Sequence, residues 1–231
     1  MTDSSLSGKV LSPSKLAHIV LRTPNFKAMV AFYKAFLGAH AVHENDNMAF
    51  LSYDAEHHRV AIFALPGCGP RVRSAAGLEH VAFTFDTLSD LVTAYRQRRA
   101  RGILPLWSVN HGPTTSIYYQ DPDGNLLETQ VDNFDDMVVA DAFMASSQFA
   151  ENPIGVDFDP EDLARRLGAG EPEAQIKKRP DIGPRTTSGI PASYMAPPKP
   201  ELRESYEPVE AANPSGEPKF IEKGRGGEIL V

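Results

Sequence analysis

The sequence predicts an α+β fold in which two βαβββ modules are followed by a long proline-rich C-terminal arm. Three observations lead to this prediction. An apolar strand pattern with a histidine at its third position, LAHIVLRT at residues 16–23, recurs as LEHVAFTF at residues 78–85. Each copy is followed by one helical pattern and then by three short strand patterns. The pattern stops toward the C-terminus, where 12 of the 19 prolines lie in residues 151–231.

The first module runs from its opening strand into a helix and three further strands. Asn25 stands at the position of a helix cap, and the segment FKAMVAFYKAFL at residues 26–37 has apolar residues at helical spacing. Gly38 ends this helix. The strand candidates that follow are HAVHE at 40–44, MAFLSY at 48–53 and HRVAIFAL at 58–65.

The second module repeats this order of elements. Asp86 or Thr87 caps the helical segment LSDLVTAYRQRRA at residues 88–100, which ends in basic residues and is followed by Gly102. The turn sequence Asp-Pro-Asp-Gly-Asn at 121–125 joins the last two strands of the module. The three strand candidates are LPLWSV at 104–109, TSIYYQ at 115–120 and LLETQV at 126–131.

We expect an N-terminal segment at residues 1–13, the paired modules at 14–133 and a C-terminal extension at 134–231. Within the extension, Asp159 and Pro160 begin one clear helix, which stops at Gly168. The apolar residues of SQFAENPIGVDFDP need a surface that buries them. We therefore expect the extension to pack on its own modules or on a neighbouring subunit, giving a homo-oligomer, with a disordered tail as the alternative.

Composition and charge narrow the class of protein. Residues 1–133 carry 12 acidic and 12 basic residues, so the net charge of −7 belongs to residues 134–231 and argues against a nucleic-acid partner. No stretch approaches the roughly 18 apolar residues of a membrane span, and the first residues lack the apolar core of a secretion signal. We expect a cytoplasmic protein. The single Cys68 excludes a cysteine metal cluster, so any metal must use histidine and carboxylate ligands.

Three polar side chains, those of His18, His80 and Glu128, stand in mid-strand between apolar or small neighbours. Strand alternation points each of them toward the packed side of a sheet. A buried unpaired carboxylate costs several kcal/mol, so Glu128 needs a partner. Two imidazoles and one carboxylate are the facial triad typical of non-haem iron(II), which leaves positions open on the metal. Taken singly, each residue has a simpler alternative: a core histidine bonded to a carbonyl, or a glutamate paired with an arginine.

With these features the sequence resembles the vicinal oxygen chelate superfamily, and within it the type I extradiol catechol dioxygenases. The resemblance rests on the paired modules, the histidine-led strands and the closing IYYQDPDGNLLE, and it covers residues 14 to about 133. It implies a cupped mixed β-sheet around a metal site. The implied ligands are His18, His80 and Glu128, the implied metal is iron(II) with manganese(II) as the alternative, and the implied substrates are a small aromatic diol and dioxygen.

The resemblance also implies a histidine that begins the last strand of the first module, where AEHHRVAIF offers His57 and His58. Alternation favours His58, because it would share a face with Val60 and Ile62. Its expected role is that of a base, since a diol must lose a proton before both of its oxygens bind a metal. An exposed loop pair is the alternative for these two histidines.

Two further residues match the same pattern in the second module. Tyr118 stands ten residues before Glu128 and is expected to hydrogen-bond a substrate oxygen. His111, in VNHGPTTSIY, matches a histidine that lies near the bound substrate. A cross-strand aromatic contact is the alternative for Tyr118.

Two other functions compete with ring cleavage. One is a redox-neutral enzyme of the same superfamily, such as a glyoxalase-like isomerase, an epimerase or a thiol transferase. Glyoxalases of this superfamily use a fourth protein ligand on the last strand of the first module, where this chain has His58, Val60 and Ile62 instead. The other is a metal-free protein that sequesters a small molecule, in which the three candidate ligands would have no reason to occur together.

Overall fold

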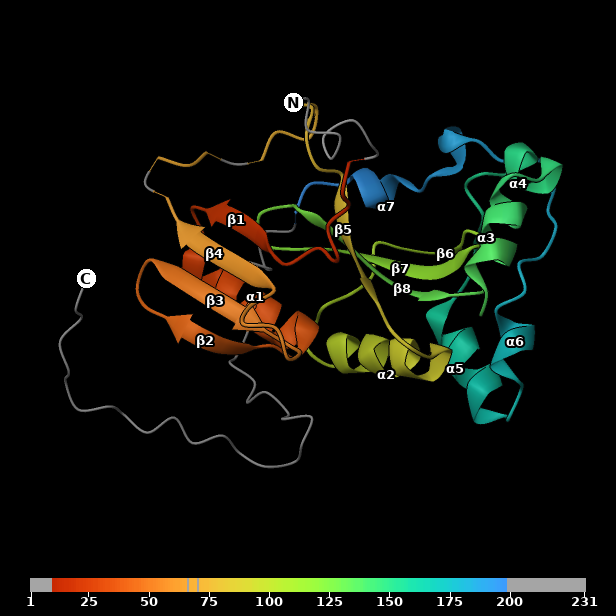
Figure 1. Cartoon of the computed structure of the whole chain (residues 1–231), viewed down its shortest axis with the longest axis horizontal. Coiled ribbons are helices and arrows are strands. Elements are labelled where there is room, and N and C mark those ends of the chain that lie inside the picture. The colour runs from red at the N-terminus through yellow and green to blue at the C-terminus, as the bar shows by residue number, and fades with distance from the viewer. Residues whose placement is uncertain (1–9, 66, 70, 199–231) are drawn as a thin grey trace, which may run out of the picture.

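A computed structural model describes residues 10–65, 67–69 and 71–198 of the chain, and Figure 1 shows its arrangement. The α+β fold predicted from the sequence is confirmed. The first module consists of β1 (Ile19–Thr23), α1 (Phe26–Leu37), β2 (His40–Glu44), β3 (Met48–Ser52) and β4 (Val60–Ala64). The second consists of β5 (His80–Thr84), α2 (Leu88–Arg99), β6 (Trp107–Asn110), β7 (Thr114–Gln120) and β8 (Leu126–Asp132).

Each module builds its own mixed sheet, and the two sheets have the same order of strands. The first sheet has the order β1-β4-β3-β2, and the second has the order β5-β8-β7-β6 with one further strand, β9 (Val156–Asp157), beside β6. In both sheets the opening strand pairs in parallel with the last strand of its module. The strands β1 and β5, which follow or contain the two repeated histidines, are therefore edge strands of their sheets.

One face of each sheet packs against the helices and forms the main core. Ile62 of β4 and Leu127 of β8 lie in the same buried cluster as Phe36 of α1 and Leu91 of α2. Alternation within the strands separates this face from the other, because residues two apart share a face. His80 and Glu128 therefore lie on the faces that are turned away from α1 and α2.

Polar contacts fasten the two modules together beside this core. The hydroxyl of Tyr33 in α1 donates to the buried carboxylate of Asp121, which begins the turn between β7 and β8, over 3.1 Å. From α2, the buried guanidinium of Arg98 donates from Nε to the carbonyl of Phe36 over 2.8 Å and lies 4.0 Å from the Phe36 ring centroid. The two modules thus share one packed interior.

The described part of the C-terminal extension is folded to a greater degree than the sequence predicts. The helix with Asp159 as its cap and Pro160 as its first residue is confirmed, ending at Gly168. Further short elements surround this one helix that the sequence clearly indicated. The elements of the extension are α3 (Met137–Met144), α4 (Ser147–Glu151), β9, α5 (Pro160–Gly168), α6 (Glu173–Ile176), η2 (Thr187–Gly189) and α7 (Ala192–Met195).

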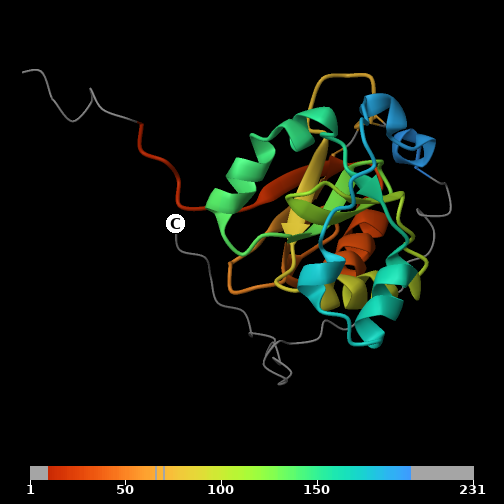
Figure 2. The same cartoon turned by 90° about the vertical axis from the view of Figure 1, so that its right-hand side faces the viewer.

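The extension wraps the second module on both sides. Figure 2 shows α5 and α6 on the side of α2, and α3, α4 and α7 on the opposite side of the strands. Strand β9 extends the second sheet, and Gly155 immediately before it has φ +104. A Cβ at this position would lie 2.2 Å from the carbonyl oxygen of Asn110, so only glycine allows this close approach of the extension to the sheet.

The helix caps agree with the sequence except at one position. Thr87 caps α2, with its side chain accepting from the Asp90 amide. Asn25 precedes α1 but makes no side-chain cap; its amide donates instead to Asp123 of the β7–β8 turn over 2.6 Å. Among the described residues, none of the helices is both long enough and apolar enough to span a bilayer.

Candidate metal and substrate site

His80 and Glu128 meet on the face of the second sheet that is turned away from the helices. His80 begins β5, and Glu128 lies on the neighbouring strand β8 with its side chain 6% exposed. The Nε2 atom of His80 and the Oε2 atom of Glu128 are 3.0 Å apart. The contact with Glu128 raises the pKa of His80. Although burial alone would raise the pKa of Glu128, hydrogen bonds from His80 and Ser116 hold it below its usual value.

Tyr118 faces Glu128 directly across the β7–β8 pair. The Tyr118 hydroxyl lies 2.9 Å from Nε2 of His111, and the His80 and Tyr118 ring centroids are 5.5 Å apart. Burial and the neighbouring Glu128 carboxylate raise the pKa of Tyr118, so its hydroxyl keeps its hydrogen. These four side chains form one contiguous group on the second module.

The tautomer of His111 follows from its other contact. Its Nδ1 atom lies 2.6 Å from the carbonyl oxygen of Ile154, and because a carbonyl only accepts, Nδ1 carries the hydrogen. Burial lowers the pKa of His111 and keeps the ring neutral, so Nε2 accepts. In this pair the Tyr118 hydroxyl is therefore the donor to His111, and Glu128 is a second acceptor beside the same hydroxyl.

The extension covers this group with an aromatic side chain. Tyr194 of α7 lies edge-on to Trp107, with 5.4 Å between ring centroids, and edge-on to Tyr118, with 5.3 Å. Trp107 and Tyr118 are themselves stacked at 5.2 Å. With Leu126 and Val109 these rings form a second buried cluster, separate from the helix-covered core. Residues of the extension, and not α2, therefore pack on the face of the second sheet to which Glu128 belongs.

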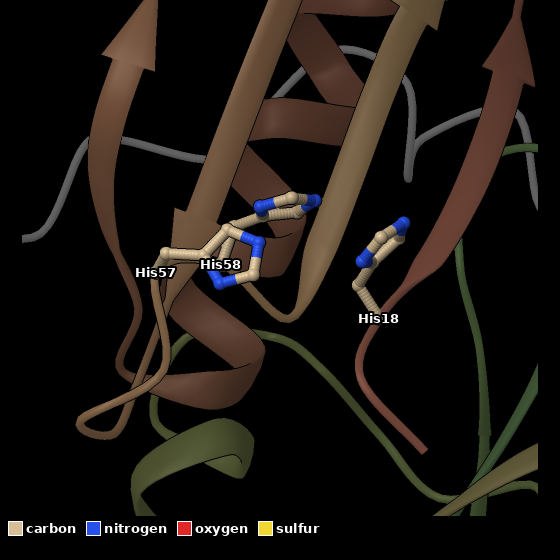
Figure 3. A group of neighbouring side chains, drawn as sticks. All are labelled: His18, His57 and His58. Carbon is tan, nitrogen blue, oxygen red and sulfur yellow. The ribbon is translucent and has the colours of Figure 1, made fainter. Parts of the chain in front are cut away.

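The third predicted ligand, His18, belongs to the first module. Figure 3 shows it beside His57 and His58, at the point where the chain enters β1. The His18 and His58 ring centroids are 4.3 Å apart, and those of His18 and His57 are 6.3 Å apart. Within the described residues, this is the group of three His, Cys, Asp or Glu side chains whose ligand atoms all lie within 4.8 Å of one another. Of the three predicted ligands, His80 and Glu128 contact each other, and His18 contacts His57 and His58.

The two neighbouring histidines have different surroundings. His57 is bound by Glu56, whose Oε1 lies 2.7 Å from Nδ1 of His57, and its side chain is 65% exposed. The ring of His58 lies edge-on to Phe50, with centroids 5.1 Å apart, and burial followed by the charges of His18 and His57 lowers its pKa. A neutral imidazole that is not held by a carboxylate is the better proton acceptor of the two.

Two details of the sequence reasoning about faces are wrong. Val60 and Ile62 point into the helix-covered core, whereas His58 precedes β4 and contacts Phe50 on the other side, so alternation is not what selects His58. The strand positions of His18 and His80 were expected to face the packed side. Their apolar neighbours are instead open, with Leu16 73% and Leu78 63% exposed.

The sequence matches one family model. The description of that family is "Glyoxalase/Bleomycin resistance protein/Dioxygenase superfamily", and the match covers residues 15–129. A relative from Rhodococcus globerulus, "Biphenyl-2,3-diol 1,2-dioxygenase 2", is 46% identical over 163 residues, which are 70% of this chain and 86% of the relative. The chain belongs to this superfamily.

Two further proteins are similar to this chain to different degrees. "Biphenyl-2,3-diol 1,2-dioxygenase 3", also from Rhodococcus globerulus, is 47% identical over 167 residues, covering 71% of this chain and 88% of the relative. The crystal structure of lactoylglutathione lyase from Agrobacterium tumefaciens is 21% identical, with a TM-score of 0.41, and covers 52% of this chain and 94% of that one. The resemblance inferred from the histidine-led strands is confirmed at the level of the superfamily.

Sequence reasoning did not identify the parts of the site that the extension supplies. The carbonyl of Ile154 and the ring of Tyr194 lie 43 and 76 positions beyond the residues they contact, His111 and Tyr118. Neither belongs to a repeated or spaced motif. The one available signal was the apolar content of residues 149–158, which indicated burial without indicating the surface.

Proposed function

We propose that this protein is an extradiol dioxygenase that opens the ring of a catechol-type aromatic diol with dioxygen, using a divalent metal held by His18, His80 and Glu128. The carbon–carbon bond next to the diol is cleaved and both atoms of dioxygen enter the product, so the reaction needs no further reductant. The observation that most supports this function is the group formed by His80, Glu128, Tyr118 and His111 in a chain that is 46% identical to a dioxygenase acting on an aromatic diol.

The donor atoms of the second module suit a divalent metal. Two ligands about 2.1 Å from a metal and at right angles to each other are about 3.0 Å apart, and His80 Nε2 and Glu128 Oε2 are separated by 3.0 Å. The Nδ1 atom of His80 is buried without a hydrogen-bond partner among the described residues. Two histidines and one carboxylate favour iron(II), with manganese(II) as the alternative. A bound iron(II) would supply the one-electron chemistry through which dioxygen reacts with the diol.

The Tyr118–His111 pair gives the site a path for the first proton. Because the Tyr118 hydrogen is directed to His111, the phenol oxygen is free to accept the hydrogen of a diol hydroxyl while it passes its own to Nε2. The Ile154 carbonyl stabilises the resulting imidazolium, since it already accepts from Nδ1. His58 is the second proton acceptor, because its ring lies against that of His18, one of the proposed metal ligands.

The aromatic surroundings suit a planar substrate. Trp107, Tyr118 and Tyr194 present stacked and edge-on rings next to Glu128, and ring pairs of this kind contribute about 0.5–1.5 kcal/mol each beyond burial. An aromatic diol bound to the metal would also pack against these three rings. Metal-free sequestration gives no role to the proton path beside the carboxylate.

The test is an anaerobic reconstitution with Fe²⁺, followed by addition of a panel of catechols and dioxygen. We expect the coloured ring-fission product, uptake of one O₂ per diol, and loss of bound metal in the Glu128→Gln variant by at least about 100-fold in affinity. Glu161→Gln, a change of the same kind on α5 outside this group of residues, is the matched control. Fission between the two hydroxyl-bearing carbons, or turnover that consumes no dioxygen, would contradict the proposal.

A further inference from the structure

We propose that His18, His57 and His58 form a second metal site, which binds Zn²⁺ and thereby withdraws His18 from the catalytic metal. The effect on catalysis rests on the proposed function, in which His18 is a ligand of that metal, whereas the second site itself does not. Each of the three imidazoles offers one nitrogen, and these atoms all lie within 4.8 Å of one another (Figure 3). Ligands of a tetrahedral zinc ion are about 3.4 Å apart, so small rotations of the three rings close the site.

The backbone that carries the three histidines is fixed at one end of the first sheet. His18 immediately precedes β1, while His57 and His58 precede β4, and the two strands pair in parallel. The guanidinium of Arg59 donates to the carbonyls of the two residues before His18, over 2.9 and 3.0 Å. The same guanidinium donates to the carboxylate of Asp54, in the loop before His57, over 2.9 and 2.8 Å. One side chain thus joins both ligand-bearing segments, so only the imidazoles have to move when a metal binds.

His57 is oriented as a ligand by Glu56. The Oε1 atom of Glu56 lies 2.7 Å from Nδ1 of His57, and because an ionised carboxylate only accepts, Nδ1 carries the hydrogen. Nε2 of the neutral ring is left with its lone pair. The second oxygen of Glu56 is paired with Lys15, which holds the carboxylate in place. A histidine that donates to a carboxylate from one nitrogen and binds a metal with the other is the common arrangement at zinc sites.

The donor set favours zinc over the metal of the catalytic site. Among the described residues, no carboxylate belongs to this group, so its three ligands are neutral imidazoles. Such a set does not compensate the charge of hard cations such as Mg²⁺ and Ca²⁺, which prefer oxygen ligands. Nitrogen ligands generally bind the later metals of the first row, including Zn²⁺, more tightly than Fe²⁺ or Mn²⁺. Three histidines with one water form a known tetrahedral zinc site.

A zinc ion at this position would remove two groups from the proposed reaction at once. His18 would no longer be free to bind the catalytic metal, and the lone pair of His58 would no longer accept a proton. His57 has no part in that reaction, and its side chain is 65% exposed, so its replacement leaves the fold and the catalytic ligands intact. His57 is therefore the residue that distinguishes the second site from the catalytic one.

The first experiment measures Zn²⁺ binding by calorimetry in the full chain with His80→Ala, which impairs the catalytic site and keeps the three histidines. We expect one Zn²⁺ per chain. Adding His57→Ala should weaken binding by at least about 100-fold, because even the partners behind a ligand change metal affinity by about 10- to 100-fold. Adding His40→Ala instead, at an exposed histidine of β2, is the matched control and should change nothing. Absence of Zn²⁺ binding, an affinity that His57→Ala leaves unchanged, or an equal loss in both variants overturns the second site.

The second experiment measures anaerobic Fe²⁺ binding without substrate, with and without one equivalent of Zn²⁺. We expect Zn²⁺ to weaken Fe²⁺ binding by at least about 10-fold more in the wild type than in His57→Ala, which keeps the catalytic ligands. An equal effect in both proteins would show direct competition at the catalytic site and overturn the withdrawal of His18. Neither experiment requires turnover, so a chain that cleaves no catechol contradicts the proposed function and leaves the zinc site standing. Circular dichroism checks that each variant is folded.

Discussion

His111 donates its Nδ1 hydrogen to the carbonyl oxygen of Ile154 across 2.6 Å, and this contact joins a strand-end histidine of the second module to the C-terminal extension. It determines which way the Tyr118 hydroxyl hydrogen points, because only Nε2 of the neutral ring is left to accept it. The extension therefore determines which nitrogen of His111, a neighbour of the Tyr118 hydroxyl, carries the hydrogen.

The first prediction concerns the coupling of His111 and Tyr118. We expect His111→Ala and Tyr118→Phe each to lower kcat/KM by about 10- to 100-fold, as removal of groups behind metal ligands commonly does. Because the two act in one path, the double variant should be no slower than the slower single variant. Steady-state kinetics of the four proteins measures this. Fully additive losses would show that the two residues act separately.

The second prediction concerns Asp121 and pH. Its buried carboxylate accepts from the Tyr33 hydroxyl and from the amide and side chain of Asn125. An asparagine at position 121 would turn an NH₂ group toward one of these donors, so we expect Asp121→Asn to cost about 1–3 kcal/mol. Urea unfolding at pH 7 measures this, with Asp123→Asn in the same turn as the control.

The pH dependence of the same variant follows from the pKa of Asp121, which burial raises to about 6 despite the hydrogen bonds from Asn125. An acid whose pKa is higher in the folded state than in the unfolded state destabilises the fold as pH rises from about 4 to about 6. The stability advantage of the wild type over Asp121→Asn should therefore shrink by about 2–3 kcal/mol between pH 4 and pH 7. A gap that widens over this range would show that the carboxylate is stabilised in its charged form.

The third prediction concerns Tyr194. Its ring is 6% exposed between Trp107 and Tyr118, so Tyr194→Ala should leave a cavity and destabilise the protein by about 3–5 kcal/mol. Tyr194→Phe keeps the ring and should cost about 1 kcal/mol. Denaturant unfolding checks both values. If the two variants were equally stable, the ring would not be part of the packed cluster.

Removal of the whole extension tests its contribution to folding and solubility. Truncation after Phe134 removes Ile154, Tyr194 and the strand β9, and thereby exposes Trp107 and the second buried cluster. We expect an insoluble or aggregating product, because a contiguous apolar face of this kind promotes association. A truncated chain with unchanged solubility and oligomer size would show that the extension contributes nothing to folding.

The fourth prediction concerns the junction between α1 and α2. Arg98 is 3% exposed, and burial lowers its pKa while its Nε donates to the Phe36 carbonyl. Arg98→Lys cannot reproduce both this bond and the planar contact with the Phe36 ring, so we expect a loss of about 2–4 kcal/mol. Thermal unfolding of Arg98→Lys beside Arg101→Lys, an exposed position on the same segment, measures the difference.

Local sequence pattern was sufficient to predict the fold of the two modules. The helix at 26–37 and the strand at 40–44 were predicted to the residue, because Gly38 and the apolar spacing act over short distances. The predicted capping role of Asn25 was wrong, because its side-chain amide donates to Asp123, 98 positions along the chain. Local preference yields where a tertiary contact offers a stronger partner.

For the candidate site, too, local pattern predicted some features, and tertiary contacts determine the others. His80 and Glu128 were predicted together, and parallel pairing of β5 with β8 brings them within 3.0 Å. Their face was expected to be the packed side of the sheet, whereas the helices α1 and α2 cover the other face and residues of the extension pack on this one. The position of His18 depends on how whole modules are arranged, and strand alternation carries no information about that.

The contact between His111 and Ile154 couples local unfolding of the extension to the catalytic rate. If residues 152–158 detach from β6, Nδ1 of His111 loses its acceptor at the same moment as the second buried cluster loses Ile154. The rate at which a protease cuts this segment and the fraction of molecules able to turn over should then respond to one free energy of opening. Substitutions far from any strand histidine would change the catalytic rate by shifting that equilibrium.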